Sequence, residues 1–125
     1  MKQTPSVPLS LLMFFFIIPH ILEDFALGEP AKAGISAPLL SLVISGMIFL
    51  QALALYWLGQ ARRQGHMANI VVGLFWAVNA GAAQLPVIFT GAPFRSGAIS
   101  VLYVLGLVIV GLLLGISSGL ALRKK

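Results

Sequence analysis

Four long apolar stretches, separated by short polar segments, account for most of this chain of 125 residues. They run approximately over 7–28, 38–60, 69–90 and 97–121. Each contains about 20 to 25 residues, which is the length that a helix needs to cross the hydrocarbon core of a bilayer. Helices are expected because an open sheet would leave backbone groups unpaired in lipid. The pattern predicts an all-α membrane protein, with one domain over 1–125 that is a bundle of four transmembrane helices.

The composition agrees with this class, since 59% of the residues are hydrophobic and only 9% are charged. Soluble domains carry about a quarter charged residues. The first stretch could instead be a secretory signal peptide, with Lys2 as its basic start. We expect a retained first helix, because His20, Glu23 and Asp24 lie where the small residues of a cleavage site would be. The absence of cysteine excludes disulfides and thiolate nucleophiles.

The net charge of +5 comes from basic residues in short clusters beside the apolar stretches. They are not interleaved with aromatic residues as in a nucleic-acid surface, so we expect no nucleic-acid partner. Lys2, Arg62, Arg63 and the tail 123–125 all fall on one side of the four spans. The excess of Lys and Arg on that side predicts cytoplasmic N and C termini. We expect a multi-pass protein of the inner or plasma membrane, in contact with the lipid bilayer.

The segment 19–24 (PHILED) carries the strongest candidate chemistry. His20, Glu23 and Asp24 are spaced i, i+3 and i+4, so they share one face of a helix. Ionisable groups at membrane depth usually face a bundle interior or a wet cavity. A carboxyl group there can exchange a proton with a nearby imidazole, which makes Glu23 the candidate acid or base and His20 its partner. The alternatives are a structural histidine and carboxylates that end the helix among lipid headgroups.

Other polar side chains fall at similar or slightly greater depth when the helical rise is counted from the outer ends of the spans: Gln84, Tyr103, Asn79 and Trp76. We expect these four, together with Asp24, to bind and orient the polar head of a ligand. In the alternative interpretation the amides, including that of Gln51, join helices to one another. Trp76 could equally face lipid.

A metal site is the weaker interpretation of the same segment. His20, Glu23 and Asp24 offer three possible ligands, but His66 belongs to a predicted basic loop (61–68) on the opposite side of the membrane, where it should be solvated. We therefore expect no metal and no cofactor. Pro19 and Pro86, in the outer halves of their helices, predict two kinks that would splay the bundle and open a small cavity.

Small residues recur every four positions on two of the predicted helices. Gly111, Gly115 and Gly119 do so on the fourth, and Gly73, Ala77 and Gly81 on the third. Such ridges let helix backbones approach closely in lipid. They predict either contact within the monomer or a homo-oligomer seam through the ridge on the fourth helix.

The motif His20-Ile21-Leu22-Glu23-Asp24 resembles that of the HXXEE group of small integral membrane proteins. Asn79 and the turn 91–97 (GAPFRSG) occupy places comparable to those in that group. This chain departs from the group at two positions. Asp24 occupies the position of the group's second Glu, and Gln84 lies near the position where the resemblance leads us to expect a His. A looser resemblance, in residue type only, is to the four-helix sterol-isomerase and sigma-two-receptor (EXPERA) group, whose members bind cationic lipophiles with His and acidic residues.

Three functions fit these features. The leading one is binding of a small hydrophobic ligand or lipid in an intramembrane pocket, with possible isomerase-like acid/base chemistry. The second is a non-catalytic accessory subunit or homo-oligomeric scaffold, held together through the glycine ridges. The third is a small transporter or channel, which the lack of charged residues in the inner half of the spans disfavours.

Overall fold

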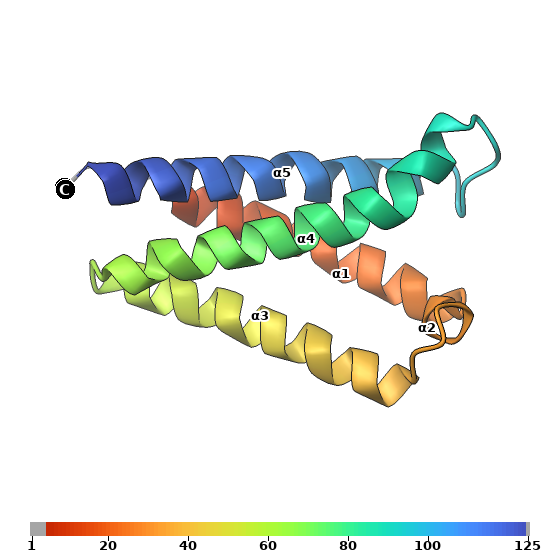
Figure 1. Cartoon of the computed structure of the whole chain (residues 1–125), viewed down its shortest axis with the longest axis horizontal. Coiled ribbons are helices and arrows are strands. Elements are labelled where there is room, and N and C mark those ends of the chain that lie inside the picture. Colours follow the sequence, from red (N-terminus) through yellow and green to blue (C-terminus); the bar gives the residue numbers. More distant parts are fainter. Residues whose placement is uncertain (1–4, 125) are drawn as a thin grey trace.

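The computed structural model describes residues 5–124, in which the regular elements are all helices. They are α1 (Ser6–Ala26), α2 (Glu29–Lys32), α3 (Ala37–Gly59), α4 (Arg63–Phe89) and α5 (Ala98–Arg123). All except the short α2 are long and apolar enough to cross a membrane. The long helices form the antiparallel bundle of Figure 1, which confirms the predicted all-α class with four membrane-length helices. Lys2 and Lys125, which entered the topology prediction, lie outside the described residues.

The predicted basic loop 61–68 is wrong, because α4 already begins at Arg63. Hydropathy marks the part of a helix that lies in lipid, whereas polar residues of good helix propensity extend the helix beyond it. Gly65 permits this extension to pack on α3, since a Cβ there would lie only 2.9 Å from the Ala54 carbonyl oxygen. His66 is consequently half-buried on a helix, and the prediction that it is solvated was also wrong.

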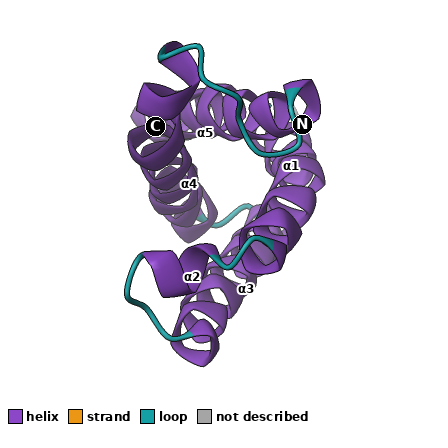
Figure 2. Cartoon of the chain, turned by 90° about the vertical axis from the view of Figure 1, so that its right-hand side faces the viewer, coloured by secondary structure: helices purple, strands orange, loops and turns teal. Residues whose placement is uncertain are grey.

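The predicted loop 28–37 contains the extra turn α2. It follows Gly28, whose φ of 70° is in the left-handed region that favours glycine, and it has Pro30 in its first turn. Ser36 then caps α3, because its Oγ accepts a hydrogen bond of 3.3 Å from the Leu39 amide. Figure 2, which looks onto this end of the bundle, shows α2 beside the start of α3. The loop thus folds back against the helices.

Charge separates the two ends of the bundle. The end with the start of α1 and the α3–α4 connection, at the left of Figure 1, carries Arg62, Arg63, Arg123 and Lys124, and is called the basic end. The opposite end holds all three acidic residues of the chain, Glu23, Asp24 and Glu29, and is called the acidic end. This separation follows directly from the antiparallel order of the helices.

Glycine brings α4 and α5 into close contact. A Cβ on Gly73 would lie 2.5 Å from the Gly111 carbonyl oxygen, and one on Gly111 would lie 2.7 Å from the Gly73 carbonyl oxygen. The two predicted ridges therefore meet within the monomer at this point. The predicted oligomer seam consisted of the glycines on α5. Gly111 is buried against α4, whereas a Cβ on Gly119 would meet no atom within 4 Å in the described part of the chain.

A neutral polar layer crosses the basic half of the bundle. Its members, all fully buried, come from each long helix: Ser6, Ser10, Gln51, Asn69 and Ser118. Gln51 Nε2 donates to the Ser10 carbonyl oxygen (2.8 Å) and also contacts its Oγ (3.2 Å), while Ser6 and Ser118 share a hydrogen bond of 3.3 Å. Gln51 thus joins two helices, as the alternative interpretation of this residue predicted.

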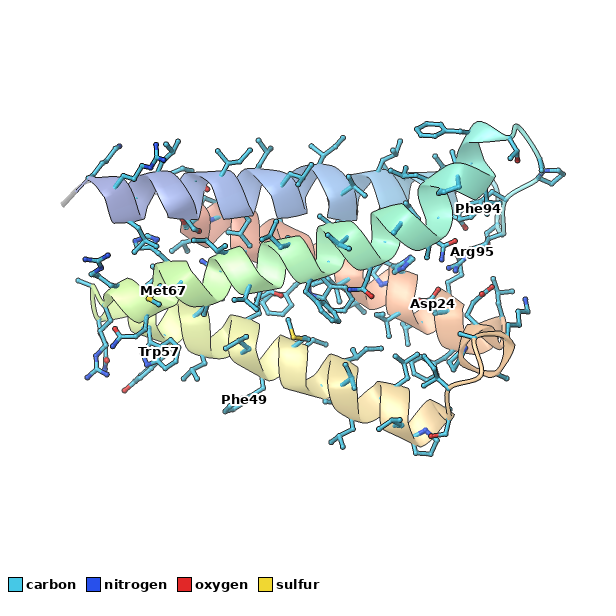
Figure 3. The ribbon with its side chains drawn as sticks, viewed as in Figure 1. Asp24, Phe49, Trp57, Met67, Phe94 and Arg95 are labelled. Atoms are coloured by element: carbon cyan, nitrogen blue, oxygen red, sulfur yellow. The ribbon has the colours of Figure 1, made fainter. Side chains whose placement is uncertain are left out.

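Large apolar side chains cover the outside of the long helices, among them Phe15, Leu42, Phe49, Val78 and Ile116. Phe49 is 69% exposed and points away from the bundle in Figure 3. A water-soluble protein would bury side chains of this kind, whereas a bilayer solvates them. The surface is therefore that of a protein in contact with lipid.

Candidate functional site

The acidic end is organised around Arg95, in the turn between α4 and α5. Only 6% of its side chain is exposed, and it meets all three acidic residues of the chain. Its Nη1 lies 3.3 Å from Glu23 Oε1 and contacts Asp24 Oδ1, and its Nη2 lies 3.9 Å from Glu29 Oε1. We call these four residues the Arg95 cluster; Figure 3 shows Asp24 and Arg95 side by side.

The turn that carries Arg95 is held in place by local contacts. Arg95 has a φ of 40°, which is uncommon for a residue with a side chain. Its guanidinium lies 5.4 Å from the ring centroid of Phe94, which is itself buried. The Ser96 amide donates to Ser100 Oγ (3.0 Å), which ties the turn to the first turn of α5. The arginine is thus positioned by a folded turn rather than by a helix.

Glu23 points toward α5. Its Oε2 accepts hydrogen bonds from Ser100 Oγ (2.6 Å) and Ser96 Oγ (3.0 Å), and its Oε1 faces Arg95. Both carboxylate oxygens are therefore engaged with the start of α5 and the preceding turn. A carboxylate held in this way by a guanidinium and two hydroxyl donors is stabilised in its charged form.

A cavity of about 240 Å³ opens beside the cluster, where α3 diverges from α4 (Figure 1). It lies between α1, α3 and α4, with α2 contributing one wall. Its apolar lining includes Ile21, Pro30, Leu40, Ile44 and Phe75. Three exposed residues, Ala33, Asn79 and Ala83, mark its mouth. Asn79 is 10 residues from the end of α4, about 15 Å along the helix, whereas Ala33 lies in the connection between α2 and α3. The mouth therefore extends from that connection sideways along the spans.

Three buried polar atoms of cavity-lining residues lack a hydrogen bond within residues 5–124. They are His20 Nδ1, Trp76 Nε1 and Asp24 Oδ1, the last of which forms an ion pair with Arg95. The side chains of His20 and Trp76 are almost fully buried, with 4% of His20 and 3% of Trp76 exposed. The opposite ring nitrogen of the histidine, Nε2, lies 3.5 Å from Asp24 Oδ2. Buried polar groups are nearly always paired, so the two nitrogen atoms without a partner are unusual, but the atoms themselves are covered and do not face the cavity surface.

The cavity gathers most of the residues that the sequence singled out: His20, Asp24, Trp76, Asn79 and Gln84. Asn79 Nδ2 donates to the Phe75 carbonyl oxygen of its own helix (2.8 Å), which leaves its Oδ1 free to accept. Two predicted site residues are not part of the lining. Glu23 faces α5, and Tyr103 belongs to α5, which contributes none of the residues that line this cavity.

The sequence reasoning missed the residues that pair with Glu23 and Asp24, which are Arg95, Ser96 and Ser100. It also missed Glu29 as a further partner of Arg95. One signal was present, because Arg95 is the only arginine predicted on the same side as the acidic residues. Carboxylates near membrane depth need a counter-ion, and that arginine was the obvious candidate. Within the described range 5–124, no group of three or more His, Cys, Asp and Glu side chains is arranged to hold a metal ion.

Comparison with known proteins does not assign a family or a function to this chain. No family model matches the sequence, no curated protein shows significant similarity to it, and no solved structure shows significant similarity to its fold. The interpretation of the site therefore rests on its own residues.

Proposed function

We propose that this multi-pass membrane protein binds a small hydrophobic molecule in the cavity at the acidic end. The observation that carries the proposal is a cavity of about 240 Å³ whose mostly apolar lining includes a few polar side chains, among them His20, Asp24 and Asn79. Ligand sites are typically concave and mostly apolar, with a few polar groups that fix orientation. The sideways mouth lets a lipophile enter from the bilayer.

Acid/base chemistry in this cavity would fall to Asp24 and His20 rather than to Glu23. Asp24 and His20 line the cavity and contact each other at 3.5 Å, whereas both oxygens of Glu23 are engaged by Arg95, Ser96 and Ser100. An imidazole backed by a carboxylate can accept and return a proton. Glu23 instead holds Arg95 in position, so that the arginine can balance Asp24.

A pair of neighbouring alanines on α4 provides a test of ligand binding. Ala83 lines the mouth of the cavity, whereas Ala82 is equally exposed but outside the lining. Native mass spectrometry of gently extracted protein should show a small co-purifying lipophile in the wild type and in Ala82→Phe. Ala83→Phe, which places a ring at the mouth, should lose it. If no such mass accompanies any of the three proteins, the proposal is contradicted.

We further propose that the basic end faces the cytoplasm, since Arg62, Arg63, Arg123 and Lys124 lie there. The cavity would then lie in the outer half of the membrane. The natural chain has no cysteine, so single cysteines can be introduced without background labelling. In intact cells an impermeant maleimide should label Ile35→Cys, at the acidic end, and leave Gln64→Cys unlabelled until the membrane is opened. The opposite pattern would invert the topology.

A further inference from the structure

Four positively charged side chains at the basic end have no acidic side chain near them. They are Arg62, Arg63, Arg123 and Lys124, and we call them the basic cluster. All four are exposed, and none of them forms an ion pair within residues 5–124. The three acidic side chains of the chain all belong to the opposite end of the bundle. The fold therefore does not balance the positive charge of this cluster.

The packing of α4 on α5 brings the cluster to one height. Gly73 of α4 lies against Gly111 of α5, where a Cβ on Gly73 would be 2.5 Å from the Gly111 carbonyl oxygen. Arg63 precedes Gly73 by 10 residues, and Arg123 follows Gly111 by 12 residues. Because the two helices are antiparallel, with a rise of about 1.5 Å per residue, the backbones of these arginines differ in height by about 3 Å. The start of α4 and the end of α5 thus present their charges together.

Neighbouring side chains place the cluster at the height of lipid headgroups. Tyr56 and Trp57 lie near the end of α3, and the Arg62 amide donates to the Trp57 carbonyl oxygen (2.9 Å). Tyr and Trp concentrate where the hydrocarbon of a bilayer meets its headgroups. One turn closer to the bilayer centre, Met67 of α4 and Leu120 of α5 are 55% and 52% exposed. The surface is therefore charged at the boundary and apolar directly beneath it, as an anionic phospholipid requires.

We propose that the basic cluster binds anionic phospholipids, with the headgroup phosphates against the arginines and the acyl chains along the apolar surface of α4 and α5. The planar guanidinium group of arginine matches phosphate oxygens with two parallel hydrogen bonds. A zwitterionic phospholipid carries its own positive charge, so it balances the cluster less well. This inference does not depend on ligand binding in the cavity, which lies toward the opposite end of the bundle.

Trp57 provides a reporter beside the cluster. In a Trp76→Phe background it is the remaining tryptophan, and bromine on an acyl chain quenches its fluorescence by contact. The full chain would be reconstituted into dioleoyl phosphatidylcholine vesicles that contain increasing amounts of brominated phosphatidylglycerol or of brominated phosphatidylcholine with the same chains. The two quenching curves give the relative affinity of the two lipids near Trp57. Both leaflets have the same composition, so the orientation of the protein does not affect the result.

Each Lys or Arg near a membrane surface strengthens the attraction to anionic lipid by about fivefold. Protein with the intact cluster should therefore favour phosphatidylglycerol at least about fivefold, and Arg62→Gln should lower that preference about fivefold. Lys32→Gln removes one exposed positive charge at the acidic end and is the matched control. It should leave the preference near Trp57 unchanged.

Three results would overturn the inference. Equal quenching by the two lipids would show that the cluster does not select anionic headgroups. A preference that survives Arg62→Gln, or that falls equally in Lys32→Gln, would assign the selection to the charge of the whole protein. A preference that inorganic phosphate removes at constant ionic strength would assign the cluster to the free ion instead of a lipid.

Discussion

The two halves of the bundle treat polar side chains in opposite ways. In the basic half, the neutral polar layer is fully buried, carries no charge, and joins α1 to α3 and α5 through hydrogen bonds. In the acidic half, three carboxylates and an arginine gather beside a cavity. The same four helices thus enclose an uncharged polar layer inside the basic half and form an open, charged site in the acidic half.

Helix separation explains the difference. At Gly65 and Gly73 the backbones of neighbouring helices approach so closely that an added Cβ would overlap them. Only small or neutral polar side chains fit between helices packed in this way. Toward the acidic end α3 leaves α4 (Figure 1), and the resulting space is a cavity with a mostly apolar lining. Close packing closes the basic half, whereas the divergence opens this cavity.

The largest effect is expected from Arg95→Leu. The substitution leaves Glu23 and Asp24 without their shared counter-ion in a largely buried site, whereas Glu29 keeps its ion pair with Lys32. Breaking a buried ion pair by removing one partner typically costs about 3 to 5 kcal/mol, so the free energy of unfolding in detergent should fall by about 3 kcal/mol or more. Arg95→Lys keeps the positive charge but loses the planar guanidinium group. Its free energy of unfolding should lie between those of the wild type and Arg95→Leu.

A compensating variant sharpens this prediction. Adding Glu23→Gln and Asp24→Asn to Arg95→Leu removes the unbalanced charges and should recover part of the lost stability. An Arg95→Leu protein as stable as the wild type would show that the Arg95 cluster is not an organising feature of the acidic end.

A smaller effect is expected from Gln51→Leu in the neutral polar layer. The substitution removes the hydrogen bonds from Gln51 Nε2 to Ser10 and leaves a side chain of similar size. Hydrogen bonds between membrane helices average about 0.6 kcal/mol, so the free energy of unfolding should fall by about 1 kcal/mol or less. Binding of lipophilic probes at the acidic end should not change. A loss as large as that of Arg95→Leu would erase the distinction between the two halves.

Hydropathy and charge were sufficient to predict the four membrane-length helices, because lipid imposes that length on any helix that crosses it. They were not sufficient to predict which way the side chains face. Glu23 and Asp24 are neighbours, yet successive residues of a helix point about 100° apart, so one faces α5 and the other faces the cavity. The rotation of each helix about its own axis is set by packing against its neighbours, so it cannot be predicted from the hydropathy pattern alone.

Arg95 shows a second limit of the sequence. It lies in a turn with a left-handed backbone conformation, and its side chain folds inward to residues more than 60 positions away in the chain. Turn residues are usually solvated, so nothing local identified this one as buried. Depth along the helices singled out four residues that line the cavity, which are His20, Asp24, Trp76 and Asn79. The same criterion also selected Glu23 and Tyr103, which do not line it, so depth alone did not identify the site.

The most direct test of the account is quenching of Trp76 fluorescence by a brominated alkylbenzene in a Trp57→Phe background, where Trp76 is the remaining tryptophan. Quenching by bromine requires contact, and Trp76 is buried on the cavity wall. The account predicts saturable quenching that survives Ala82→Phe and is lost in Ala83→Phe. Weak quenching that rises linearly with quencher and is identical in both variants would show that no ligand reaches this cavity.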